Sequence, residues 1–91
     1  MRWRQVSIMS AESIKIEEVK HLKKMLEGSP ACANKEDRAV YLDSELEGDY
    51  KRLCMIHEIL EIWLQGRVKH SKIDLIAIDI IEGLRKIGEI K

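Results

Sequence analysis

The fold is decided by the stretch CMIHEILEIWL, residues Cys54–Leu64, the most apolar long run of the chain. On a helical wheel of residues 50–65, with about 100° per residue, the apolar side chains cover well over half of the circumference. The remaining polar arc is narrow and holds His57, Glu58 and Glu61. We therefore predict a largely buried helix over residues 50–65, with Gly66 as its terminator.

The polar arc of this helix carries residue types that bind metal ions. His57 and Glu61 are four residues apart and share one helix face. Imidazole nitrogen and carboxylate oxygen both bind zinc, at about 2.0–2.2 Å. Glu58 stands where a carboxylate could act as general base for a metal-bound water. The order His-Glu-x-x-Glu is that of the zinc-peptidase motif H-E-x-x-H, with glutamate in place of the second histidine.

A third protein ligand has to come from outside this helix. Asp79, at the border of the apolar stripe of the last helix, is our first choice, and His70 and Asp74 are alternatives. A site with one histidine and two carboxylates binds zinc less strongly and is more tolerant of other divalent metals.

The rest of the chain divides into short elements. Apolar spacing predicts a strand over residues 2–9, a helix over 16–27, a loop over 28–37, a strand over 38–43, a connector over 44–49 with Asp49 as N-cap, and a helix over 72–90. Two short strands must pair and be covered by helices. We therefore predict a single α+β domain, residues 1–91, with three helices on a small two- to three-stranded sheet and a central helix carrying H-E-x-x-E.

Composition limits the classes of partner. Of the 91 residues 45% are apolar, and the 16 basic and 16 acidic residues balance to a net charge of zero. This balance makes nucleic acid an unlikely partner. No apolar segment reaches the roughly 18 residues of a membrane span, and the N-terminus lacks the apolar core of a signal peptide. Cys32 and Cys54 form no C-x-x-C, which is typical of free thiols in a cytoplasmic protein.

Residues 38–64 resemble a known family of enzymes. The strand RAVYLDSEL, an acidic connector and the helix YKRLCMIHEILEIWL are similar to the core of ImmA/IrrE-type and phage-associated small zinc metallopeptidases. The resemblance covers about a third of the chain, and its exact motif element is His57-Glu58. It implies zinc bound by the motif, Glu58 activating water, and an edge strand over residues 38–42 that borders the cleft and can pair with an extended substrate.

Two functions follow as hypotheses. The first is a small metal-dependent hydrolase, a zinc peptidase acting on a peptide or protein, with Glu58 as general base and His57, Glu61 and Asp79 as ligands of zinc or another divalent metal. The alternative is a non-catalytic interaction module, such as a homodimer, that keeps the metallopeptidase-like fold without activity. Its support is an excess of apolar residues for one small core, namely Ile62, Trp63, Leu75, Ile78 and Ile90.

Overall fold

The chain forms an α+β domain, as predicted, in a computed structural model that describes residues 13–91. The elements in chain order are β1 (Lys15–Val19), α1 (Leu22–Met25), β2 (Ala31–Asn34), β3 (Ala39–Asp43), α2 (Gly48–Leu64) and α3 (His70–Lys86). The strand predicted over residues 2–9 lies outside the described residues. Among residues 13–91, no helix is long and apolar enough to cross a membrane.

The three strands form one mixed sheet in the order β1-β3-β2. β1 runs parallel to β3, with Ile16 opposite Val40, and β2 runs antiparallel to it, with Ala33 opposite the same residue. Because β3 has a neighbour on each side and a helix over one face, Val40 and Leu42 are almost completely buried. The strand predicted over residues 38–43 is confirmed, but it is the central strand of the sheet.

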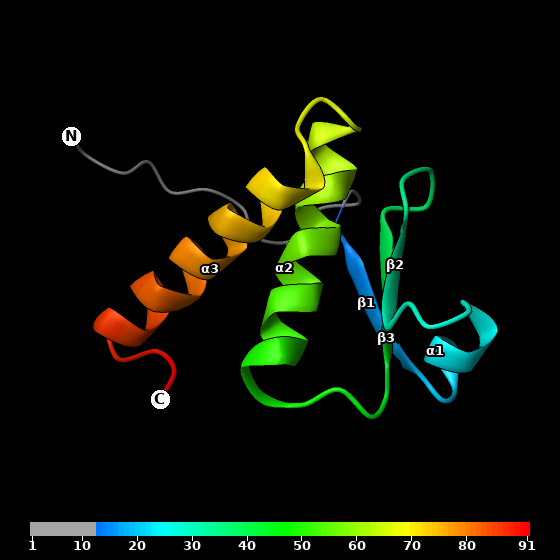
Figure 1. The fold of residues 1–91 in the computed structure, drawn as a ribbon, viewed down its shortest axis with the longest axis horizontal. Coiled ribbons are helices and arrows are strands. Elements are labelled where there is room, and N and C mark those ends of the chain that lie inside the picture. Colours follow the sequence, from blue (N-terminus) through cyan, green and yellow to red (C-terminus); the bar gives the residue numbers. More distant parts are fainter. Residues whose placement is uncertain (1–12) are drawn as a thin grey trace.

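The elements form layers, which Figure 1 shows as α3, α2 and the sheet side by side, with α1 beyond the sheet. α2 covers the sheet with Ile62, which packs in a core with Ala31, Val40 and Leu42. On its other side α2 packs against α3 through a second core. α2 is thus the middle layer, which confirms the central helix and explains its wide apolar surface.

The helix predicted over residues 16–27 is wrong in its first half. Residues 15–19 form β1 instead, and His21 follows with a φ of 61°, in the left-handed region that interrupts a helix. The apolar residues Ile16, Val19 and Leu22 fit a helical period, but pairing with β3 along five residues decides the conformation. Local periodicity is a weak prior when a neighbouring strand supplies backbone partners.

The predicted loop over residues 28–37 contains a strand, β2, which the sequence did not indicate. Asn and, to a lesser degree, Ala are depleted in strands, so no local signal marks it. The turn to β3 is held by Asn34, whose Oδ1 accepts the Asp37 backbone N–H at 3.1 Å. β2 is therefore a strand imposed by its pairing with β3 and by its contact with α2.

The helix ends and one core assignment also need correction. α2 begins at Gly48, and Asp49 lies in its first turn instead of capping it, with its carboxylate paired to Arg52 and Arg85. α3 ends at Lys86 because Ile87 and the left-handed Gly88 terminate it. Ile62, counted among the apolar residues in excess of one small core, is buried at 3% exposed, whereas Trp63 of the same set is 63% exposed. The guanidinium of Arg38 lies over its ring, 5.0 Å from the centroid.

Candidate metal centre

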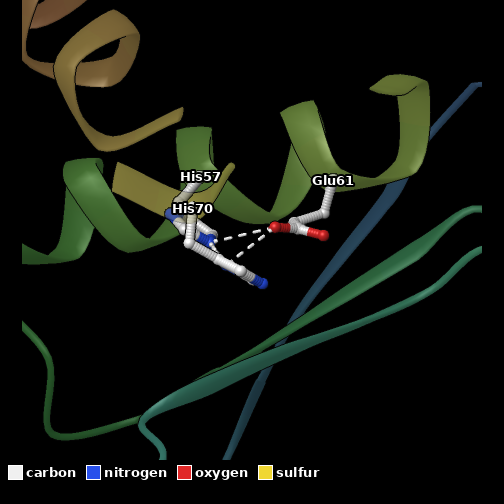
Figure 2. Close-up of side chains that lie close together, drawn as sticks. All are labelled: His57, Glu61 and His70. Atoms are coloured by element: carbon white, nitrogen blue, oxygen red, sulfur yellow. Dashed lines mark hydrogen bonds and ion pairs between the residues drawn. The ribbon is translucent and has the colours of Figure 1, made fainter. Parts of the chain in front are cut away.

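Two helices bring together a cluster of three side chains that could hold a metal ion, namely His57, Glu61 and His70, here called the His–Glu–His cluster (Figure 2). α2 contributes two of them, one turn apart on the same face. The third is the first residue of α3. The link between the helices is short because Gln65 and Gly66 both adopt left-handed backbone conformations. This tight turn places the start of α3 beside the last turns of α2.

The three donor atoms are spaced as ligands of one ion would be. His57 Nε2 lies 3.4 Å from Glu61 Oε1 and 3.2 Å from His70 Nδ1, and the distance between His70 Nδ1 and Glu61 Oε1 is 3.0 Å. Atoms about 2.1 Å from a tetrahedral ion lie roughly 3.4 Å apart. The three separations are therefore compatible with one ion held by all three atoms.

Burial differs across the cluster in a way that suits a metal site. The side chains of His57 and Glu61 are 16% and 15% exposed, whereas that of His70 is 76% exposed, so the cluster can be reached from solvent. Glu61 Oε1 is buried and accepts no hydrogen bond. Both neighbouring histidine nitrogens lie at ion-pair distance from it, but neither is directed for hydrogen bonding. A buried carboxylate oxygen without a donor is costly, and a cation would satisfy it.

Asp74 orients His57. Its Oδ1 lies 2.6 Å from His57 Nδ1, and a carboxylate can only accept there, so Nδ1 carries the proton. The lone pair of His57 Nε2 is then directed at the cluster. Carboxylate–histidine–metal arrangements of this kind fix the tautomer and ring orientation of a ligand. Asp74, predicted as an alternative third ligand, therefore contacts His57 and is not itself part of the cluster.

Glu58 lines a cleft of about 250 Å³ next to the cluster. This α2–β2 cleft lies between α2 and residues 29–31, and His57 and Asp74 also line it. The pKa of the Glu58 carboxyl lies above its ordinary value, chiefly because the group is partly buried. The nearby histidines His57 and His70 act to lower this pKa, and the negative charge of Glu61 acts to raise it. A carboxylate that is partly desolvated beside the cluster is suited to accepting a proton.

The predicted third ligand, Asp79, lies away from this site. It is exposed on α3, nine residues after His70, which is about 13 Å along the helix axis. It is also turned about 140° around the helix from Asp74. The structure brings His57, Glu61 and the alternative His70 together. The short link after α2 is the signal that favours His70, because it keeps the first turn of the next helix near the motif.

The strand expected to border the cleft also changes. Of residues 38–42, all but Arg38 belong to β3, which is paired on both sides and has no free edge. The edge strands are β1 and β2, and the first residue of β2, Ala31, lines the α2–β2 cleft. The reason is topological, since the hairpin returns β3 between β1 and β2.

No protein family, no curated protein and no solved structure matches this chain.

Proposed function

We propose that this protein is a small metal-dependent hydrolase that binds a divalent ion, zinc in the first place, through the His–Glu–His cluster and cleaves peptide bonds. The observation that carries the proposal is the spacing of the three donor atoms, 3.0–3.4 Å, which suits one tetrahedral ion. Two imidazoles and one carboxylate are a donor set of catalytic zinc sites, in which a fourth position stays open. The resemblance of residues 38–64 to small zinc metallopeptidases supports the same reading.

Each side chain then has one role. His57, Glu61 and His70 would hold the ion, which would polarise a water molecule and the substrate carbonyl. Glu58 would take a proton from the attacking water as the water oxygen bonds to the carbonyl carbon. It would pass that proton to the leaving nitrogen as the C–N bond breaks, which returns Glu58 to its starting state. Asp74 keeps the His57 lone pair directed at the ion.

The edge of β2 supports a peptide as the substrate. The Asp43 N–H donates to Pro30 O at 2.8 Å, so the alternation of an antiparallel ladder turns the backbone groups of Ala31 and Ala33 away from β3. Consistent with this, Ala31 O accepts a hydrogen bond from Ser29 Oγ, outside the ladder. An extended peptide can add to such an edge by main-chain hydrogen bonds. Ala31 lies on the wall of the cleft that holds Glu58.

The test measures metal content and turnover in matched variants. The purified chain should contain or take up about one zinc ion, and His70→Ala should abolish tight binding. Glu58→Gln should keep the metal and lose hydrolysis of a peptide library. Asp79→Asn removes a charge from the same helix as His70 and should change neither. Failure of the chain to bind zinc, cobalt or manganese more tightly than about millimolar would refute the proposal.

A second candidate is an interaction module formed with a second copy of the chain. Leu75 and Ile78 are 61% and 40% exposed on α3, next to the face that packs on α2. Exposed apolar residues on one helix favour a contact. Sedimentation over a wide concentration range tests this candidate, because a dimer should dissociate on dilution. Leu75→Glu should raise the protein concentration at which half of the chains are dimeric. A constant monomer mass would exclude it.

A further inference from the structure

A second cavity lies between α2 and α3, at the far end of both helices from the His–Glu–His cluster. This α2–α3 pocket has a volume of about 370 Å³. Its apolar lining comes from Tyr50, Leu53, Ile78 and Ile81. At its rim Arg85 Nη2 donates to Asp49 Oδ2 at 2.5 Å. An apolar surface with a few polar groups at one end is typical of a site for a side chain of a ligand.

The pocket and the α2–β2 cleft are neighbours along α2. Both are lined by Tyr50 and Leu53, so the two cavities meet at the first turns of α2. From His57 to Asp49 the helix rises by about 12 Å. An extended peptide covers that length with three or four residues, at roughly 3.3 Å each. A chain with its reacting bond at the cluster would thus reach the pocket with a side chain three or four positions away.

The charges that line the α2–α3 pocket and the α2–β2 cleft disfavour acidic ligands. Glu58 and Asp74 line the end near the cluster, and Glu82 lines the α2–α3 pocket. Among residues 13–91, Arg85 is the one lysine or arginine that lines either cavity, and it is paired with Asp49. The walls therefore carry more negative than positive charge, and a neutral or basic peptide fits better than an acidic one.

We propose that the α2–α3 pocket is a specificity subsite for an aliphatic side chain, such as leucine, three or four residues from the hydrolysed bond of a neutral or basic peptide. This inference rests on the proposed metal centre. Ile78 is the residue that determines the specificity, because it lines the pocket. It is 40% exposed and belongs to neither of the two cores that α2 forms, so its substitution leaves those cores in place.

The first experiment uses the metal as an anchor for probes of increasing length. Two series of hydroxamates are titrated into the zinc-loaded chain, acetyl-Leu-Gly(n)-hydroxamate and malonyl-hydroxamate-Gly(n)-Leu-amide, with acetohydroxamate as reference. In one series affinity should rise about tenfold where the leucine lies three or four residues from the hydroxamate, the gain expected from burying part of that side chain. Replacing leucine by glutamate should remove the gain. A flat length dependence in both series would overturn the subsite.

Matched variants locate the effect. Ile78→Glu should abolish the length-dependent gain and leave acetohydroxamate binding unchanged. Leu75→Glu places the same charge three residues earlier on α3, at a more exposed position outside the pocket lining, and should keep the gain. Equal losses in both variants would contradict the assignment.

The second experiment needs no metal. N-acetyl-leucinamide is titrated into the metal-free chain, and the methyl NMR signals of Leu53, Ile78 and Ile81 are followed. Shifts that are absent in Ile78→Glu support the subsite, and unperturbed methyl signals refute it. Methyl shifts without acetohydroxamate binding to the zinc-treated chain would instead refute the metal centre, and would leave the pocket as a site for an aliphatic side chain without a role in hydrolysis. Acetohydroxamate binding without methyl shifts would refute only the subsite.

Discussion

Replacing Asp74 by asparagine tests whether the cluster is built as a metal site. The wild-type carboxylate accepts from His57 Nδ1–H at 2.6 Å, a charge-assisted hydrogen bond. The amide keeps the shape but weakens this bond and can turn its NH₂ group toward the ring. Removal of such a partner typically lowers metal affinity 10- to 100-fold. Because the Asp74 side chain is 49% exposed, solvent screens the interaction, and we expect about tenfold, or ~1.4 kcal/mol.

The assay is a competition titration of zinc against a chromophoric chelator at fixed ionic strength. Asp79→Asn is the matched control, since it removes the same charge from the same helix at an exposed position away from the cluster. Long-range electrostatics alone would weaken zinc binding equally in both variants, and that result would refute a specific role for Asp74. A loss as large as that of His70→Ala would instead make Asp74 a direct ligand and refute the assigned ligand set.

Three further outcomes follow from the structure. Zinc at a free concentration 100 times its dissociation constant should raise the free energy of unfolding by about 2.7 kcal/mol, and the gain should vanish with a chelator or in His70→Ala, as measured by urea denaturation. Ile73→Ala leaves a cavity at a fully buried position one turn after His70. It should lower the free energy of unfolding by about 2–5 kcal/mol in the same assay and also weaken zinc binding. An unchanged free energy of unfolding would contradict the packing of α3 on α2. Backbone N–H groups of Lys23 and Glu45 lower the pKa of Asp43 below its ordinary value of 3.8, so its stabilisation is complete above that pH and is lost as pH falls through the lowered pKa. Asp43→Asn should therefore be less stable than wild type at neutral pH and lose less on acidification, and parallel acid-unfolding curves for the two proteins would contradict this.

The central helix and its polar arc could be predicted from the sequence alone. Helix α2 contains a long run of apolar residues at helical spacing. The relation of His57 to Glu61 is local, because residues four apart share a face of any helix. The strand β3 was also predictable, since its β-branched and aromatic centre, Val40 and Tyr41, favours a strand. These features depend on residues close together in the chain.

The tertiary structure decided the features that depend on distant partners. β1 and β2 have weak or misleading local patterns and become strands because β3 supplies hydrogen-bond partners on both of its edges. The third member of the cluster was equally undetermined, since His70, Asp74 and Asp79 are all polar residues near the start or middle of α3. The turn at Gln65 and Gly66 sets how α3 lies against α2, and this packing brings His70 to the motif while Asp79 stays exposed. H-E-x-x-E thus marks two donor atoms of the cluster, and the helix crossing supplies the third.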